Sequence, residues 1–319
     1  MSEEMDELHV VIGTGPLGMA VMEELLFQGK KVRMVNRSGH ANVPSSVQVM
    51  KGDATSSVEF AAACRGASVI YHCAKAPYTA WPEMFPPIMD GIIEAAENEK
   101  AIVVYADNLY MYGVTRRDLT EDLPNRADGR KGITRAQMAN RLLTAHRSGK
   151  LRAAIGRAPD FFGPGVLDSA LGERVFRAAL EGKPAEVLGN IDAPHTYIYI
   201  RDFAKGLVKL GQSQASLGHI WHIPASETLT TRQMVSMVYS MAGREPRFRV
   251  APKAFVSLLS LFNANMREIK EMLYLFEEPL VVNTSKYEKM FGKDTTPHEQ
   301  AVAETMAWYQ SLSDQQKIS

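Results

Sequence analysis

Three glycines near the N-terminus have the spacing of a phosphate-binding turn. Gly13, Gly15 and Gly18 form a Gly-x-Gly-x-x-Gly pattern directly after the apolar run 9–12, and a helical pattern follows at once. In such a unit, backbone N–H groups and the helix dipole face an anion, and the missing side chains let it approach. The pattern therefore predicts a nucleotide-binding turn formed by Gly13, Gly15, Pro16, Leu17 and Gly18.

The end of the next apolar run indicates which dinucleotide is bound. A site that prefers NAD has an acidic residue about 20 residues after the glycines, where it binds the adenosine ribose hydroxyls. Here that place holds Asn36, Arg37 and Ser38. A guanidinium suits the 2′-phosphate of NADP, and its two neighbours add neutral hydrogen-bonding groups. We expect NADP rather than NAD; the alternative is that Arg37 is a solvated loop arginine.

Further candidates follow other apolar runs, where an open parallel sheet binds its ligands. Asp53 follows the run 47–50, and its carboxylate could accept from the adenine amino group, cap the next helix, or do both. Other expected cofactor contacts are Ala54, Ala74, Lys75, Pro159 and Phe161. Expected walls of a substrate pocket are Tyr78, Trp81, Asp160 and Phe162, with core packing as the alternative. Their aromatic share suits an apolar substrate.

Short apolar runs alternate with helical patterns through the first half of the chain. Strands are predicted at 9–12, 32–35, 47–50, 67–72, 101–105 and 153–155, and helices include 58–64, 83–97 and 134–146. This alternation predicts an α/β fold, a doubly wound parallel Rossmann sheet with right-handed crossovers. The expected nucleotide-binding domain is 1–163, with a return segment near 196–212.

The second half has a less regular pattern. It predicts helices at 170–181, 202–210, 231–242, 253–262, 266–275 and 297–310, and strands at 196–200 and 220–223. We expect residues 164–319 to form mostly a smaller, mixed α/β lobe that binds the substrate.

The composition is that of an ordinary globular protein. The 319 residues are 45% hydrophobic, and 36 basic residues balance 36 acidic ones, so neither nucleic acid nor a membrane is an expected partner. The acidic start, residues 1–7, is unlike a signal peptide. Cys64 and Cys73 suit reduced thiols in a cytoplasmic protein. The eight histidines are scattered in the sequence, and we expect no metal site.

Several motifs together resemble the extended short-chain dehydrogenase/reductase family, which includes sugar-nucleotide epimerases and dehydratases. They are the glycine turn, Tyr110-Met111-Tyr112-Gly113, the segment 157–165 (Arg-Ala-Pro-Asp-Phe-Phe-Gly-Pro-Gly), the segment 197–202 and the segment 283–286. The likeness spans almost the whole chain. It implies a Rossmann fold and a nicotinamide cofactor.

The catalytic residues that this resemblance implies are replaced here. The family uses a Ser or Thr, and a Tyr followed by Lys four residues later; in this chain Asn108, Lys131 and Arg135 fall on those three positions. The chain therefore looks like the atypical subgroup that lacks Tyr-x-x-x-Lys. Asn108 would orient the substrate oxygen, and Arg135 would hold the nicotinamide ribose. Lys131, Tyr110 or water would supply the proton, unless Lys131 is a surface lysine and Tyr110 only packs.

These observations predict an NADP-dependent oxidoreductase that reduces a carbonyl or activated double bond of a small, mostly apolar molecule. One alternative is a non-catalytic NADP-binding redox sensor or scaffold. An epimerase or dehydratase is a further alternative, although it would ordinarily need the missing Tyr. The expected partner is a small-molecule substrate, and the expected assembly is a monomer or homodimer.

Overall fold

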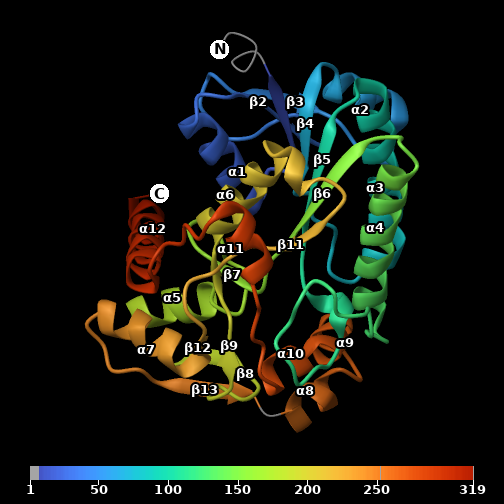
Figure 1. Cartoon of the computed structure of the whole chain (residues 1–319). Coiled ribbons are helices and arrows are strands. Elements are labelled where there is room, and N and C mark those ends of the chain that lie inside the picture. The colour runs from blue at the N-terminus through green and yellow to red at the C-terminus, as the bar shows by residue number, and fades with distance from the viewer. Residues whose placement is uncertain (1–6, 252, 319) are drawn as a thin grey trace.

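A seven-stranded parallel sheet forms the centre of the structure, a computed structural model that describes residues 7–251 and 253–318 (Figure 1). Its strand order is β11-β6-β5-β4-β1-β2-β3. The strands are β1 (Leu8–Ile12), β2 (Lys31–Asn36), β3 (Gln48–Lys51), β4 (Ala67–His72), β5 (Ile102–Asp107), β6 (Arg152–Arg157) and β11 (Ile220–His222). This order confirms the predicted doubly wound Rossmann sheet. Most of the acidic start, residues 1–6, lies outside the described residues.

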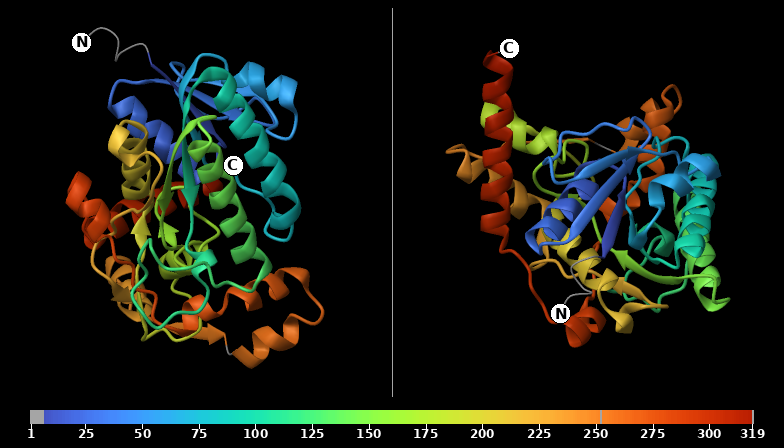
Figure 2. Two further views of the ribbon diagram at one scale, coloured as in Figure 1. Left: turned by 45° about the vertical axis from the view of Figure 1, so that its right-hand side comes forward. Right: turned by 90° about the horizontal axis from the view of Figure 1, so that it is seen from above.

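Helices cover both faces of the sheet (Figure 2). One layer contains α1 (Pro16–Phe27) and α6 (Ile200–Gly211), and the other contains α2 (Ser57–Cys64), α3 (Trp81–Glu99) and α4 (Arg130–Arg147). Successive strand residues point to opposite faces: Val11 belongs to the first core, whereas Val10 and Ile12 belong to the second. Because both faces of the central strands β1, β4 and β5 are buried, these strands appear in the sequence as continuous apolar runs.

The second lobe combines short helices with two-stranded sheets beyond the carboxyl ends of the main strands (Figure 1). Its sheets pair β7 (Phe161–Phe162) with β10 (Ile198–Tyr199), β8 (Ala185–Leu188) with β13 (Phe248–Ala251), and β9 (Pro194–His195) with β12 (Leu229–Thr230). Its helices are α5 (Glu173–Glu181), α7 (Thr231–Met241), α8 (Lys253–Leu259), α9 (Ala264–Met272), α10 (Tyr274–Glu277), α11 (Ser285–Phe291) and α12 (His298–Ile318). Short 3-10 helices are η1 (Tyr110–Tyr112) and η2 (Gln214–Ser216).

Two predicted elements differ from the structure, and a third, found as predicted, joins the main sheet. The strand predicted at 196–200 is only the two-residue β10, because α6 already begins at Ile200. The strand predicted at 220–223 is β11, which joins the edge of the main sheet next to β6. Helix α4 begins at Arg130 rather than at 134: Gly132 weakens the local helical signal, but Glu271 accepts a hydrogen bond from the Lys131 N–H at 2.8 Å.

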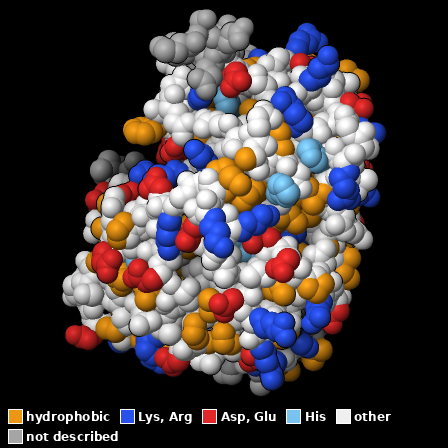
Figure 3. All heavy atoms as spheres, in the orientation of Figure 1, with side chains coloured by type: hydrophobic (Ala, Val, Ile, Leu, Met, Phe, Trp, Pro, Cys, Tyr) orange, Lys and Arg blue, Asp and Glu red, His pale blue; other side chains and the backbone are white. Residues whose placement is uncertain are grey.

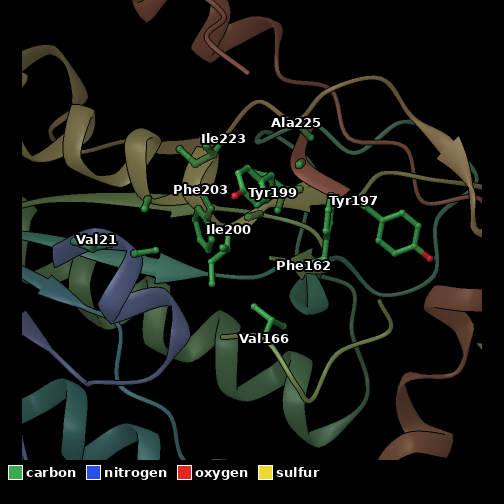
Figure 4. Packing of buried hydrophobic residues seen from close by; sticks show 14 of the residues in the cluster. Val21, Phe162, Val166, Tyr197, Tyr199, Ile200, Phe203, Ile223 and Ala225 are labelled. Carbon is green, nitrogen blue, oxygen red and sulfur yellow. The ribbon is translucent and has the colours of Figure 1, made fainter. Parts of the chain in front are cut away.

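Phe162 belongs to the core between the two lobes. Its side chain is fully buried and packs with Tyr199 (Figure 4). It also contacts Phe176 and His298. The prediction that Phe162 lines a substrate pocket is therefore wrong. It is the buried member of β7, whereas its neighbour Phe161 is only partly buried and packs on Phe203 of α6.

The surface carries both signs of charge. Basic and acidic side chains are interspersed on the face seen in Figure 3. Among the described residues, no helix is both long enough and apolar enough to cross a bilayer. Both cysteines are free thiols: Cys64 is buried and Cys73 partly buried, and burial raises the pKa of each to about 12.

Three buried histidines make stability depend on pH. Burial lowers the pKa of His9 to about 4, and that of His72 and His222 to about 3. Between pH 6.5 and these values the unfolded chain binds protons that the folded chain does not, so the free energy of unfolding must fall as the pH falls. Each histidine contributes up to about 1.4 kcal/mol per pH unit.

Urea denaturation at pH 7 and pH 5 checks this expectation. His72→Phe preserves a ring stacked on Tyr105 and removes one titrating group, so it should lower the slope of the free energy of unfolding against pH by up to about 1.4 kcal/mol per pH unit. His40→Phe, the same exchange at an exposed position, should leave the slope unchanged. Equal slopes in all three proteins would contradict the assignment.

Candidate functional site

The three glycines of the turn differ in the space that a Cβ atom would have at each position. Gly13 has a φ of +103°, and a Cβ there would lie 2.8 Å from the carbonyl oxygen of Cys73. A Cβ at Gly18 would collide with the carbonyl oxygen of Gly13, where α1 packs on β1. Gly15 has an ordinary φ of −74° and open space where its Cβ would stand. The turn is thus closed on the protein side and open above Gly15, which fits a pyrophosphate at the start of α1.

The end of β2 is tied to this turn. Asn36 donates to the Thr14 hydroxyl at 3.0 Å, and its oxygen accepts from Ser38 at 3.1 Å and from the Gly39 N–H at 2.6 Å. Arg37 follows with an exposed side chain. Asn36 and Ser38 therefore shape the loop, while Arg37 presents a charged group beside it.

Asp53 shapes the loop between β3 and α2. Its Oδ1 accepts from the Thr55 N–H at 2.9 Å and from the Thr55 hydroxyl at 2.8 Å, and these bonds lower its pKa, with a contribution from Arg37. The N-cap of α2 is Ser56, so Asp53 stabilises the turn before the helix instead of capping it. Ala54 lies beyond it, with its carbonyl packed against Gly91 of α3.

Arg135 is enclosed below the carboxyl end of β5. Its guanidinium donates to the Tyr105 hydroxyl at 2.6 Å and lies 3.6 Å from Asp107 Oδ1. The rings of Trp81 and Phe85 stand 4.5 and 4.4 Å from it. Burial disfavours the charge, but Tyr105 and Asp107 outweigh burial and raise the pKa of Arg135. A contact with the nicotinamide ribose stays a prediction.

Lys131 is not a surface residue. It is 1% exposed, forms ion pairs with Glu268 and Glu271 of α9, and lies 4.2 Å from the centre of the Tyr78 ring. Burial lowers its pKa, while Glu271 acts in the opposite direction. The alternative of a solvated lysine is therefore wrong, and this side chain joins the start of α4 to the second lobe.

Asn108 and three aromatic side chains form one wall beyond β4 and β5. Asn108 Oδ1 accepts from the Tyr110 N–H at 3.1 Å, which leaves its amide NH2 group as the donor for a substrate. Tyr110 stacks on Trp81 at 5.8 Å, and Trp81 meets Tyr78 edge-on at 5.4 Å. Trp81 is largely buried, so it supports the wall from behind, while Tyr78 is partly exposed.

The loops after β4 and β6 flank the glycine turn. Ala74 and Lys75 follow β4, and Lys75 forms an exposed ion pair with Asp168 at 3.8 Å. A Cβ at Gly165 would lie 3.5 Å from Pro16, so the loop after β7 lies against the start of α1. Pro159 is buried and Phe161 partly buried in the segment that leads to this loop.

Asp160 follows β6, the strand next to β5. Its Oδ2 lies 3.0 Å from Nε2 of His195, and its charge acts on the hydroxyls of Tyr78 and Tyr110. His195 is 3% exposed and lies between Tyr197 and Phe276.

The sequence analysis missed three residues that the structure brings to this region: Asp107, His195 and Glu268. Asp107 ends a strand and could have been found as a carboxylate at a carboxyl end. No local signal pointed to the other two, because they lie in the second lobe. Within the described parts of the chain, no group of three or more His, Cys, Asp or Glu side chains could hold a metal ion.

Comparison of the sequence with known proteins finds a matching family model and several similar proteins. A sequence model of the "NAD dependent epimerase/dehydratase family" matches residues 10–223. The chain is 27% identical over 259 residues to the decarboxylating sterol-4-alpha-carboxylate 3-dehydrogenase of Bos taurus, covering 76% of this chain and 71% of that one. It is 21% identical over 205 residues to an uncharacterized UDP-glucose epimerase of Bacillus subtilis, covering 61% and 65%.

Solved structures with the same fold include sugar-nucleotide enzymes. UDP-glucuronic acid 4-epimerase from Bacillus cereus, in complex with UDP-glucuronic acid and NAD, has a TM-score of 0.78 at 17% identity, covering 96% of this chain and 99% of that one. dTDP-glucose 4,6-dehydratase from Bacillus anthracis, in complex with NAD, has a TM-score of 0.77 at 15% identity, covering 96% and 97%.

Proposed function

Because the chain belongs to the NAD-dependent epimerase/dehydratase family, we propose that it is an NADP-dependent oxidoreductase acting on a small, mostly apolar substrate. The reaction is the interconversion of a carbonyl and an alcohol, or the reduction of an activated double bond. The observation that carries this proposal is the glycine turn after β1, closed around Gly13 and Gly18 but open above Gly15, together with the aromatic wall beyond β5 and β4, the neighbour of β1. A bound nicotinamide would supply or accept the hydride.

Each side chain of the site has a role in this proposal. The Asn108 amide donates a hydrogen bond to the substrate oxygen and stabilises the negative charge that develops on it. Tyr78 and Tyr110 exclude water from the reacting carbon. Arg135 supports the nicotinamide side of the site, and Lys131 holds the second lobe against α4 through Glu268 and Glu271.

The relatives support the substrate class to different extents. The Bos taurus relative is named for a sterol, a large apolar molecule, which favours an apolar substrate here. The sugar-nucleotide epimerases and dehydratases favour a polar one, but the Tyr that such chemistry ordinarily needs is missing from this chain. Their complexes contain NAD, so NAD is the alternative cofactor.

Oxidation of NADPH with a panel of apolar ketones, aldehydes and enones tests the proposal. We expect turnover with at least one carbonyl compound, and an Asn108→Ala variant that binds NADPH but is slower. If NADPH binds tightly and no compound in a broad panel is reduced, a cofactor-binding sensor becomes the better description.

Arg37 should decide between the two cofactors. Replacing Arg37 with Ala removes a charge-assisted hydrogen bond to the 2′-phosphate, worth about 1.5–3 kcal/mol, so NADP affinity should fall about 10- to 100-fold. NAD affinity should stay within about twofold, because NAD has no 2′-phosphate. Calorimetric titration of both cofactors measures the difference.

A matched control is Arg147→Ala, an exposed arginine at the end of α4 that leads into the amino end of β6. It should leave both affinities unchanged. Tighter binding of NAD than NADP to the unaltered protein, or an equal loss of both cofactors in the Arg37 variant, would refute the assignment of NADP.

A further inference from the structure

We propose that Asp160 and His195 form the proton-transferring pair of this site. The assignment rests on the proposed oxidoreductase function and names the group that replaces the missing tyrosine. Reduction of a carbonyl needs a proton as well as a hydride. Asn108 cannot give up a proton at neutral pH, and the ammonium of Lys131 is engaged by Glu268.

The geometry of the pair is fixed from both sides. Asp160 Oδ2 and His195 Nε2 are 3.0 Å apart, which is hydrogen-bond distance. The imidazole stacks on Tyr197 at 4.3 Å and lies almost parallel to Phe276, at 5.4 Å and 4°. The Asp160 carbonyl accepts from the Ile198 N–H at 3.1 Å, so the backbone of the carboxylate is held as well. The ring contacts of His195 and the backbone hydrogen bond of Asp160 thus hold the two groups at this distance.

The two members differ in exposure. His195 is 3% exposed, whereas the side chain of Asp160 is 20% exposed. The carboxyl group is therefore the end of the pair that a substrate can reach, and the imidazole is the buried end that orients it. Carboxyl–imidazole pairs also serve in unrelated enzymes, where the imidazole exchanges the proton with the substrate and the buried carboxylate orients it; here the two roles are exchanged.

Asp160 also lies at the edge of the sheet formed by the carboxyl ends of the strands. It follows β6, the neighbour of β5, and ligands of such sheets bind beyond the carboxyl ends of the strands. Its charge raises the pKa of Tyr78 and of Tyr110, after the larger effect of burial, so it lies near the two hydroxyls of the aromatic wall. The carboxyl group and the Asn108 amide thus follow two neighbouring strands, β6 and β5, at the same edge of the sheet.

The transfer of hydride and proton conserves atoms and electrons both in reduction and in oxidation. In reduction, the carbonyl carbon gains a hydride from the reduced nicotinamide dinucleotide, the electron pair of the C=O π bond moves to oxygen, and that oxygen takes the proton shared by Asp160 and His195. Solvent then returns a proton to the pair. In oxidation, the Asp160 carboxylate accepts the alcohol proton while hydride leaves carbon, and His195 stabilises the protonated pair.

Asp160→Asn and His195→Gln test the pair, measured with the substrate found in the NADPH assay. The amide of the first variant can still accept from His195, so the fold should be retained, but the variant cannot donate the proton. We expect kcat to fall about 100-fold, within the usual range for loss of a general acid, with an unchanged NADPH Kd. His195→Gln should shift the pH profile of kcat/KM and slow the reaction less.

Matched controls are Asp294→Asn and His40→Gln, the same exchanges at exposed positions, which should leave kcat and the pH profile unchanged. Undiminished kcat in Asp160→Asn, with wild-type turnover present, overturns the pair and leaves the oxidoreductase proposal intact. A parallel loss of Tm, NADPH binding and kcat without a change in the pH profile also overturns it, because the pair would then be structural. Absence of wild-type turnover overturns the function and the pair together.

Discussion

Replacing Asp107 with Asn is expected to lower the free energy of unfolding by about 3–5 kcal/mol, the usual cost of leaving a buried charge without its partner. The Asp107 side chain is fully buried, and its Oδ2 accepts from Arg157 Nε at 3.0 Å. Its Oδ1 lies 3.6 Å from Arg135. One carboxylate therefore serves two buried guanidinium groups, and an amide of the same shape would leave both without a counter-charge.

A chain of hydrogen bonds continues beyond Asp107, so the neighbouring side chains cannot easily rearrange to compensate for the lost counter-charge. Arg157 donates to the Tyr112 hydroxyl at 2.8 Å, and this hydroxyl lies 2.7 Å from His222 Nε2. His222 Nδ1 lies 3.1 Å from the carbonyl oxygen of Asn283 in the second lobe. The network joins β5, β6 and β11 to the segment before α11, so its atoms cannot easily move to solvent.

Urea denaturation measures the expected loss, with Asp90→Asn as the control. Asp90 pairs with Arg141 at 2.6 Å between α3 and α4, but both side chains are about half exposed. The same chemical exchange should therefore cost less than about 1 kcal/mol there. If Asp107→Asn is too unstable to purify, Tyr112→Phe, which removes one acceptor of Arg157, should cost about 1–3 kcal/mol. Similar small losses for the two aspartate variants would contradict the buried network.

The fold followed from the sequence because its signals are local. The central strands of the main sheet are buried on both faces and are visible as apolar runs, and Gly13, Gly15 and Gly18 mark the turn between β1 and α1. Ends of elements were less predictable. The start of α4 is stabilised by Glu271, which stands 140 positions away from Lys131, and no window around Gly132 contains that information.

The candidate site was predictable only where it depends on strand ends. Tyr110 and Asp160 were proposed because they follow β5 and β6, and Asn108 because it falls on a position of the family's pattern; their roles stay predictions. His195 was not, since it belongs to a two-residue strand and meets Asp160 across 35 positions. Phe162 was misplaced because alternation in a short strand decides which of two neighbouring phenylalanines is buried, and the sequence does not reveal the phase. The role of Lys131 depends on Glu268, a residue of the other lobe.

A methyl group at Gly15 should abolish cofactor binding without unfolding the protein. The backbone there is extended, with φ of −74° and ψ of 178°, and an added Cβ would meet no atom within 4 Å. Any residue can adopt this conformation, so the stability of the free protein should change by less than about 1 kcal/mol. The same methyl would stand in the open space where a pyrophosphate approaches the start of α1.

The expected loss follows from the contacts that would be blocked. If the methyl group prevents two hydrogen bonds from backbone N–H groups to the charged pyrophosphate, each worth about 1.5–3 kcal/mol, affinity should fall by more than about 100-fold. Calorimetric titration with NADP and NAD measures this directly. The thermal shift that either cofactor produces in the unaltered protein should disappear in Gly15→Ala at the same concentration.

Gly18→Ala is the informative comparison. It adds the same methyl group three positions away, but there the methyl group should lower the stability of the free protein. Its Cβ would collide with the Gly13 carbonyl, so the free protein itself should be destabilised as α1 is pushed away from β1. Loss of binding with an unchanged Tm at Gly15, beside loss of Tm at Gly18, would separate the surface that faces the ligand from the surface that holds the turn. Normal binding by a well-folded Gly15→Ala variant would mean that the dinucleotide does not lie on this turn, and the assignment of the whole site would fail with it.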